Sequence, residues 1–377
     1  MLVCATVVGA QAQTVSTFAN LQRGAYGDGL TMSASGDLYA SQGYNGSVVL
    51  MIDKQANVSV FASGLQGSVG AFFDSEGFLY VNSYSGGFIY RLDEEGTIST
   101  LAIGLNGPAG VVISPSDEVF VSEYGADFSG QGSRVKKMST SGIASSYFTG
   151  GGLQDVIGIA LDESGNLYVS NWGSGKIYKI TPQKELSLFA DIPGSINQIA
   201  YANGHLFVPS PSLNKVFSID LAGTVTLIAG TGSAGSADGP ALEATFNRPN
   251  SVAVNPAGDV LYILDAATGV IRKIDLQVST GLGDAGTELP RTLGLGQAYP
   301  NPFSASTTIS YSLPRAGLVS LRVFDILGRE VSALVETAQE AGQHSVEFSA
   351  GDLPSGIYSY LLETGAERAA KTMFLLR

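Results

Sequence analysis

Three oxygen-bearing side chains, Glu123, Asn171 and Asp265, occupy the same position in separate copies of a repeated motif. Carboxylate and amide oxygens are the ligands that Ca²⁺ takes in proteins. A calcium site is therefore one interpretation of this pattern. The alternative, which we favour, is that these residues face water or cap the ends of strands. The other copies have Gln42, Ser83 and Ser210 at the same position.

Aromatic residues directly follow this position in three copies, as Tyr84, Tyr124 and Trp172. A flat ring with an apolar face could stack on a sugar or grip a peptide. The alternative is that the rings pack between neighbouring repeats. These three residues are the candidate ligand contacts, and the sequence assigns no catalytic residue.

The sequence has few residues that could support other kinds of catalysis. The chain has two histidines, His205 and His344, which are too few for a three-histidine zinc site. Cys4 is the only cysteine and lies in an N-terminal apolar stretch that we expect to be removed. A thiol nucleophile is therefore not expected in the mature chain, and Ca²⁺ is the one cofactor that the pattern suggests.

The motif that places these residues is repeated six times. Each copy has a turn ending in glycine, an apolar strand with an aromatic residue, and then small polar residues. The copies follow one another at about 40 residues, with two longer intervals, which is the period of a four-stranded propeller blade. The aromatic anchors are Tyr39, Tyr80, Phe120, Tyr168, Phe207 and Tyr262.

Each copy contains four strand-like pieces, which in the second copy are residues 69–74, 78–83, 88–93 and 98–101. Short apolar runs separated by glycine-containing turns predict β-hairpins. The turn before the aromatic strand requires a positive φ, which glycine adopts at little cost, and the third copy has Asp117 there. The predicted fold class is all-β, with a six-bladed β-propeller over residues 13–276.

The N-terminal segment 15–21 resembles the fourth strands of other copies, such as 58–65 and 186–192, yet it precedes the first copy. The last copy ends at residues 271–275 without a fourth strand of its own. We therefore expect segment 15–21 to supply that strand, which would join the first and last blades and remove a free sheet edge.

The last copy, residues 230–275, resembles the NHL repeat. It contains, in order, a glycine-rich stretch, Asp238-Gly239, Ala244-x-Phe246, Pro249 and Ile271-Arg272-Lys273. The resemblance implies a propeller of the NHL and gluconolactonase-like superfamily. Gluconolactonase-like propellers use a set of one Glu, one Asn and one Asp in their sites. The resemblance therefore also implies a Ca²⁺-dependent lactonase- or esterase-like hydrolase that would use Glu123, Asn171 and Asp265.

Alternating strands with Gly and Pro turns predict a small Ig-like β-sandwich over residues 298–377, after a linker at 277–297. Its motifs resemble the C-terminal sorting domain of type IX secretion cargo, which implies that this machinery is a partner and exports the chain. The alternative is a sugar-binding or adhesive sandwich. The motif residues are Tyr299, Pro300, Asn301, Pro302, Phe303, Gly328, Arg329, Gly356, Tyr358 and Lys371.

The N-terminal segment and the net charge of the chain limit where the protein can be located and which partners it can have. Residues 1–12 are largely apolar and end in Ala10-Gln11-Ala12, the form of a signal-peptidase site, so we expect a signal-peptide remnant there. No apolar run reaches the ~20 residues of a transmembrane segment. The net charge of −13 repels phosphate backbones, so nucleic acid is not an expected partner.

These observations favour a secreted or outer-membrane-surface binding protein that passes through the periplasm. Its ligand would be a glycan, a peptide or a protein. The alternative is the Ca²⁺-dependent hydrolase that the gluconolactonase-like resemblance implies.

Overall fold

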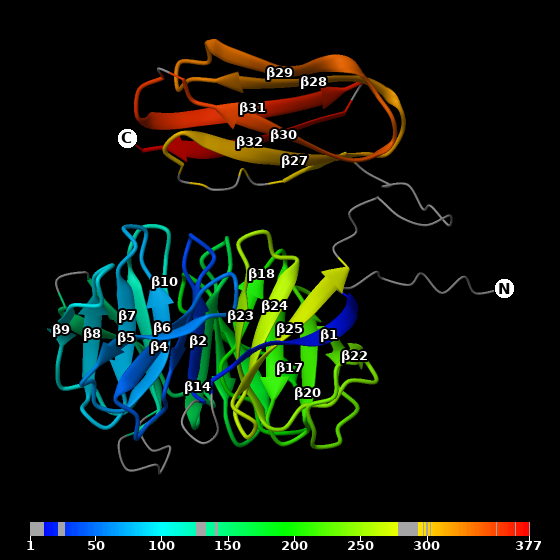
Figure 1. Cartoon of the computed structure of the whole chain (residues 1–377). Coiled ribbons are helices and arrows are strands. Elements are labelled where there is room, and N and C mark those ends of the chain that lie inside the picture. The colour runs from blue at the N-terminus through cyan, green and yellow to red at the C-terminus, as the bar shows by residue number, and fades with distance from the viewer. Residues whose placement is uncertain are drawn as a thin grey trace. The chain divides into compact units, whose positions relative to one another are not determined.

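The computed structural model describes residues 11–21, 27–125, 133–139, 142–277, 293–296, 298, 301, 303–351, 353–365 and 367–376. It divides the chain into two compact units, Met1–Val278 and Ser279–Arg377 (Figure 1). The described residues contain strands and turns but no helix. Of the expected signal-peptide remnant, residues 1–10 lie outside the described residues.

The first unit is a six-bladed β-propeller, which confirms the predicted fold. Five blades are four-stranded antiparallel sheets whose strands follow one another in chain order from the centre outwards. The blades are β2 Gly29–Met32, β3 Leu38–Ser41, β4 Val48–Ile52 and β5 Val58–Ser63; β6 Ser68–Phe73, β7 Leu79–Ser83, β8 Phe88–Leu92 and β9 Ile98–Ala102; β10 Pro108–Ile113, β11 Val119–Glu123, β12 Arg134–Met138 and β13 Ala144–Thr149; β14 Val156–Leu161, β15 Leu167–Asn171, β16 Lys176–Ile180 and β17 Leu186–Asp191; and β18 Ala200–Ala202, β19 His205–Ser210, β20 Lys215–Asp220 and β21 Val225–Ala229.

The sixth blade is closed by the N-terminal strand, as predicted. β1 Gln11–Asn20 pairs antiparallel with β25 Val270–Gln277, with Val15 opposite Ile274. The inner strands are β24 Val260–Asp265 and β23 Pro249–Val254, and the short β22 Gly239–Pro240 pairs with the outer side of β1. The strand begins earlier than segment 15–21 and includes Gln11 and Ala12 of the expected signal-peptide remnant.

The blades are held together by packed side chains and by serine hydroxyls. The aromatic anchors Tyr80, Tyr168 and Phe207 are at most 1% exposed and pack between neighbouring blades. In the third and fourth blades, the second-strand residues Ser122 and Ser170 donate to backbone carbonyls of the next blade, at 2.5 Å and 2.8 Å. These contacts fix the first strands around the central channel.

Glycine has two distinct uses in this packing. The predicted positive φ of the hairpin turns is confirmed, for example at Gly77 with φ 91° and at Asp117 with φ 57°. Gly110, on a first strand, has no such φ, but a Cβ there would lie 2.3 Å from the carbonyl oxygen of Ile157 in the next blade. Only glycine therefore lets these two first strands approach so closely.

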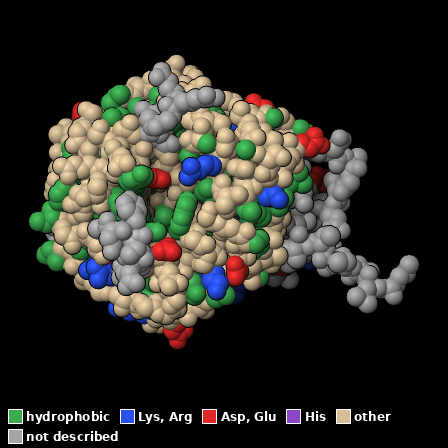
Figure 2. Space-filling model, turned by 90° about the horizontal axis from the view of Figure 1, so that it is seen from below, with side chains coloured by type: hydrophobic (Ala, Val, Ile, Leu, Met, Phe, Trp, Pro, Cys, Tyr) green, Lys and Arg blue, Asp and Glu red, His purple; other side chains and the backbone are tan. Residues whose placement is uncertain are grey.

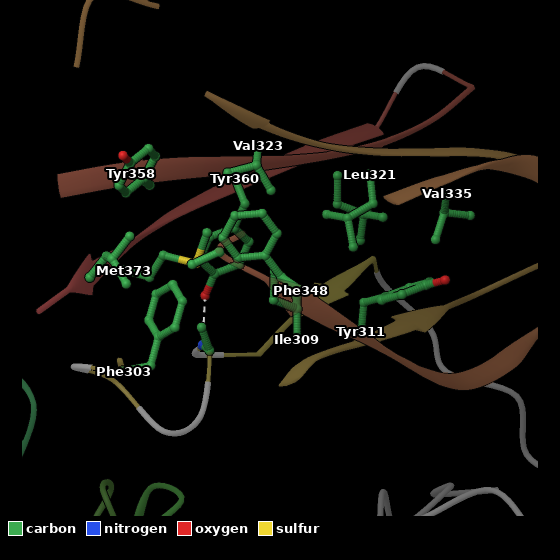
Figure 3. Close-up of a cluster of buried hydrophobic side chains, with 14 of the residues drawn as sticks. Phe303, Ile309, Tyr311, Leu321, Val323, Val335, Phe348, Tyr358, Tyr360 and Met373 are labelled. Atoms are coloured by element: carbon green, nitrogen blue, oxygen red, sulfur yellow. Dashed lines mark hydrogen bonds between the residues drawn. The ribbon is translucent and has the colours of Figure 1, made fainter. Parts of the chain in front are cut away.

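The second unit is a β-sandwich with one core. One sheet contains β26 Gly294–Leu295, β27 Ser306–Leu313 and β30 Gly342–Ser349; the other contains β29 Glu330–Gln339, β28 Gly317–Phe324, β31 Gly356–Thr364 and β32 Glu367–Leu375. Figure 3 shows the core, where Phe303, Phe348, Tyr360 and Met373 lie between the sheets. Of the expected linker 277–297, Gln277 belongs to β25 and Gly294–Leu295 to β26.

Candidate ligand-binding site

A cavity of about 290 Å³ opens at one mouth of the central channel, where the second strands end and the first strands begin. The first strands of all six blades line a further cavity of the same volume. In Figure 1 β25 runs upward from Val270, which pairs with Asp265 at the end of the second strand of the sixth blade. The second strands therefore end at the lower side of the propeller in this view, and the mouth opens there. Figure 2 views that face and shows hydrophobic side chains gathered near its centre, with acidic and basic side chains beside them. The mouth is lined by Asp28, Tyr44, Val69, Tyr84, Ala109, Tyr124, Ile157, Trp172, Asn197, Arg248 and Asn250.

Aromatic side chains form one wall of the mouth. Tyr84, Tyr124 and Trp172, the three predicted ligand contacts, all line it, and Tyr44 joins them from the first blade. The Tyr84 hydroxyl donates to the Gly125 carbonyl of the next blade at 2.6 Å, and its ring centroid lies 6.4 Å from that of Tyr124. Because Tyr84 is buried while Tyr124 and Trp172 are half-buried, the latter two offer more ring surface to a ligand.

A chain of polar side chains from the first, fifth and sixth blades lines the rest of the mouth and adjoins the aromatic wall at Tyr44. Asn197 Nδ2 donates to Asn250 Oδ1 at 2.7 Å, and Asn250 Nδ2 donates to Asp28 Oδ1 at 2.9 Å. The other Asp28 oxygen accepts from the Tyr44 backbone N–H at 3.2 Å. Burial raises the pKa of Asp28, although these hydrogen bonds and the charge of Arg248 act in the opposite direction.

Asn197 is 4% exposed, yet its Oδ1 atom has no hydrogen-bond partner in the described part of the chain. A buried polar atom of this kind normally costs about 1–3 kcal/mol and calls for a partner. Asn197 lines the cavity, so a donor on a bound molecule that displaced the atoms covering this oxygen would satisfy it.

Arg248 stands at the rim of the same mouth and is exposed. Its backbone has a φ of 62° and is held by hydrogen bonds to Asn214 Oδ1 at 2.9 Å and from the Ala266 N–H at 3.1 Å. Its guanidinium has no hydrogen bond or ion pair within the described ranges. The same backbone conformation occurs at Gly67, Gly107 and Asp155, whose carbonyls accept the equivalent hydrogen bond in their own blades, so it is a feature of the repeat.

The predicted calcium ligands lie at strand ends and do not line the mouth. Glu123 accepts from the Asn106 N–H at 2.9 Å and forms an ion pair with Arg134. Asn171 Nδ2 donates to the Gly152 carbonyl at 2.9 Å. Each residue thus contacts the loop before the first strand of its own blade.

Asp265 makes the same kind of contact, since its carboxylate accepts from the Asn247 N–H at 2.7 Å and from Thr268 Oγ1 at 3.0 Å. Among the residues that the structure describes, no three His, Cys, Asp or Glu side chains cluster as metal ligands. A calcium site built from Glu123, Asn171 and Asp265 therefore remains a prediction.

Asp265 gives a pH-dependent stability that can be measured. Burial raises its pKa from 3.8 to about 7, against the hydrogen bonds from Asn247 and Thr268. Between these two values the folded chain holds a proton that the unfolded chain has lost, so the free energy of unfolding falls as pH rises and levels off above pH 7. From pH 5 to 7 this loss is about 2 kcal/mol.

The substitution Asp265→Asn should remove this part of the pH dependence. The amide oxygen can still accept from the Asn247 N–H, so the variant should equal or exceed the native chain in stability at pH 7.5. Urea unfolding at pH 5, 6, 7 and 7.5, with EDTA present, measures the change, and Asp191→Asn on an exposed strand end is the control. Parallel curves for the native chain and Asp265→Asn would contradict the raised pKa.

The described motif residues of the second unit have clear structural roles. Asn301 Oδ1 accepts from the Phe374 N–H at 2.7 Å, and the Phe303 N–H donates to the Phe374 carbonyl at 2.9 Å, so both fasten the entry segment to β32. Gly328, with φ 75°, completes the turn in which Asp325 binds Arg329 Nε at 2.7 Å. Tyr358 is buried, Gly356 begins β31, and Lys371 is exposed on β32. Tyr299, Pro300 and Pro302 lie outside the described residues.

Residues 297–375 match the family model described as a secretion system C-terminal sorting domain. This match confirms the resemblance of the second unit to sorting domains. No curated protein matches the chain. The described residues contain no helix that is long and apolar enough to cross a membrane.

Solved structures resemble the propeller at low sequence identity. A gluconolactonase from Xanthomonas campestris has 18% identity and a TM-score of 0.57, over 72% of this chain and 96% of the other. An auxiliary nutrient binding protein from Bacteroides ovatus has 16% identity and a TM-score of 0.59, over 71% and 78%. Virginiamycin B lyase from Staphylococcus aureus has 15% identity and a TM-score of 0.52, over 88% and 98%. At these identities the shared feature is the fold, and function must be argued from the site.

Proposed function

We propose that this propeller binds a ligand in the mouth of its central channel. Residues 297–375, the secretion system C-terminal sorting domain, would direct it to the cell surface or the medium through the type IX pathway. The observation that carries the proposal is one cavity with three complementary features. It has an aromatic wall, a buried acceptor without a partner at Asn197, and a free guanidinium at Arg248.

These features match the usual composition of a small-ligand site. Such sites are concave, largely apolar, and contain a few convergent polar groups, with volumes of about 300–1,000 Å³. The mouth, at about 290 Å³, is at the lower end of this range. The nutrient-binding protein from Bacteroides ovatus has a similar fold, which supports capture of a small extracellular molecule.

Trp172 should dominate the apolar part of the binding energy. A stacked aromatic ring contributes about 0.5–1.5 kcal/mol beyond its buried area, so Trp172→Ala should weaken binding about tenfold or more. Arrays of immobilised glycans and peptides, probed with the labelled full chain, measure the loss. Leu188→Ala, an exposed apolar residue on the outer strand β17, is the control. Equal array signals for Trp172→Ala and the native chain would contradict the proposed site.

A Ca²⁺-dependent lactonase- or esterase-like hydrolase is a second candidate, and a specific observation favours it. Asp28, Asn250 and Asn197 are joined by hydrogen bonds at the mouth, and the partnerless Asn197 oxygen suits a hard cation. Their carboxylate and amide oxygens would hold the ion, which would polarise a substrate carbonyl as a Lewis acid. Arg248 would then orient the substrate from the rim.

Thermal unfolding with Ca²⁺ and with EDTA tests this candidate. A ligand at 100 times its Kd stabilises the folded state by about 2.7 kcal/mol. If the mouth holds the ion, Ca²⁺ should raise the Tm of the native chain and of Asp265→Asn, but not of Asp28→Asn. A shift that Asp265→Asn abolishes would instead support the predicted strand-end ligands, and no shift at all would contradict a calcium site.

A further inference from the structure

The charges at the mouth point to an uncharged ligand. Asp28 and Arg248 line the same cavity without forming an ion pair, so the lining has one charged group of each sign, and Asp155 lies next to it with a hydrogen bond to Tyr124. A singly charged organic cation would be attracted by Asp28 but repelled by Arg248 at the rim, so it gains little net attraction. An anion would face Asp28 and a chain with a net charge of −13. A neutral molecule meets neither penalty.

The hydrogen-bonding groups require a ligand that both donates and accepts. Asn197 Oδ1 is a buried acceptor without a partner, and the Asp28 carboxylate has lone pairs beyond those used by Asn250 and Tyr44. Arg248 offers up to five N–H donors. Hydroxyl groups serve both purposes, because each one can donate to Asn197 or Asp28 and accept from Arg248.

The aromatic wall requires an apolar face on the same molecule. Trp172 and Tyr124 are half-buried and come from adjacent blades, so they offer ring surface to the same cavity that the polar groups line. A ligand that meets both walls must therefore have hydroxyl groups around its edge and C–H groups on a flat face.

We infer that the mouth binds a neutral sugar ring, with its C–H face on Trp172 and Tyr124 and its hydroxyl groups on Asn197, Asp28 and Arg248. This inference rests on the proposed function and gives the chemical class of its ligand. It also gives the basis of specificity, since Asp28 and Arg248 together select against uronic acids and amino sugars of the same ring configuration.

Trp172 is the only tryptophan in the chain, so its fluorescence reports on this mouth alone. The experiment titrates the full chain with methyl glycosides of the gluco, galacto and manno series. Each is compared with its uronic acid and its 2-amino analogue, and saturation-transfer NMR provides a second readout. We expect at least one neutral glycoside to change the emission and to bind at least tenfold more tightly than its two charged analogues.

The variants test the contacts one by one. Asn197→Leu should weaken binding at least tenfold, Arg248→Gln should weaken it severalfold, and Lys54→Gln, on an exposed turn, should leave it unchanged. A charged analogue that binds as tightly as its neutral glycoside would overturn the inference. Binding by Asn197→Leu that equals that of the native chain would overturn it too. So would a panel in which no sugar binds. If no sugar binds, a change of Trp172 emission with a peptide library would still support the proposed function. No response to either the sugars or the peptides would contradict the proposed function as well.

Discussion

Replacing Arg272 by alanine should lower the free energy of unfolding of the propeller by about 3–5 kcal/mol. Arg272 is fully buried in β25 and donates to the Thr245 carbonyl at 2.7 Å, the Ala237 carbonyl at 3.0 Å and Asp238 Oδ1 at 2.6 Å. The substitution would leave two carbonyls without their donor and a cavity beside Phe246.

The effect should extend to the closure of the ring, because Asp238 also accepts from the Thr17 N–H of β1 at 3.0 Å. Arg272 thus positions the residue that fixes the N-terminal strand. Urea unfolding followed by Trp172 emission reports on the propeller alone, since the second unit has no tryptophan. The neighbouring Lys273→Ala, whose ion pair with Asp275 is at the surface, should cost less than about 1 kcal/mol.

Arg272→Lys separates charge from geometry. Lysine keeps the charge but cannot reproduce the fork of donors that serves three acceptors. It should therefore recover only part of the loss. A cost below about 1 kcal/mol for Arg272→Ala would show that the buried guanidinium does not hold the closure.

Removing residues 297–377 should abolish export and leave the propeller folded in the periplasm. The family match places the sorting signal in residues 297–375, and the propeller has its own closed ring and its own cores. Cell fractionation in a host with the type IX machinery measures the distribution, and Trp172 emission of the retained protein checks that it is folded. Full-length Leu188→Ala, which keeps Trp172 and the sorting domain and should be exported normally, is the control.

Release of the truncated chain into the medium at the native level would contradict the sorting role. Loss of the truncated chain by proteolysis would be visible as a missing band rather than a periplasmic one. The two outcomes are therefore distinguishable in the same experiment.

Repetition made the fold predictable from the sequence. Each blade repeats the same aromatic anchor and turn, so Tyr80 and Tyr168 mark equivalent second strands although no long-range contact is visible in the chain. The closure was predictable because segment 15–21 carries the pattern of a fourth strand that the last repeat lacks. The boundaries of the strands and of the linker were predicted less accurately, since β1 begins at Gln11 and β26 forms inside the expected linker.

Only part of the mouth was predictable. Tyr84, Tyr124 and Trp172 follow the aromatic strands directly, so their position in the repeat identified them. Tyr44 was missed because Gly43 separates it from the equivalent position by one residue.

The polar side of the mouth was missed for another reason. Asp28, Asn197, Arg248 and Asn250 precede or begin first strands, which have no aromatic anchor to align them. They come from the first, fifth and sixth blades, and only the closed ring brings them together. A signal was present, since Asp28, Asn197 and Asn250 hold the same place in their repeats, at the start of the first strand. The other three copies have apolar residues at that place, so the position did not stand out as polar.

Acrylamide quenching of Trp172 in the full chain, with and without a ligand identified on the arrays, tests the central claim most directly. The account predicts that a ligand in the mouth covers the half-buried indole, so that the quenching constant falls and the emission shifts to shorter wavelength as binding saturates. A ligand that binds by calorimetry yet leaves the quenching of Trp172 unchanged would show that the binding site lies elsewhere on the protein.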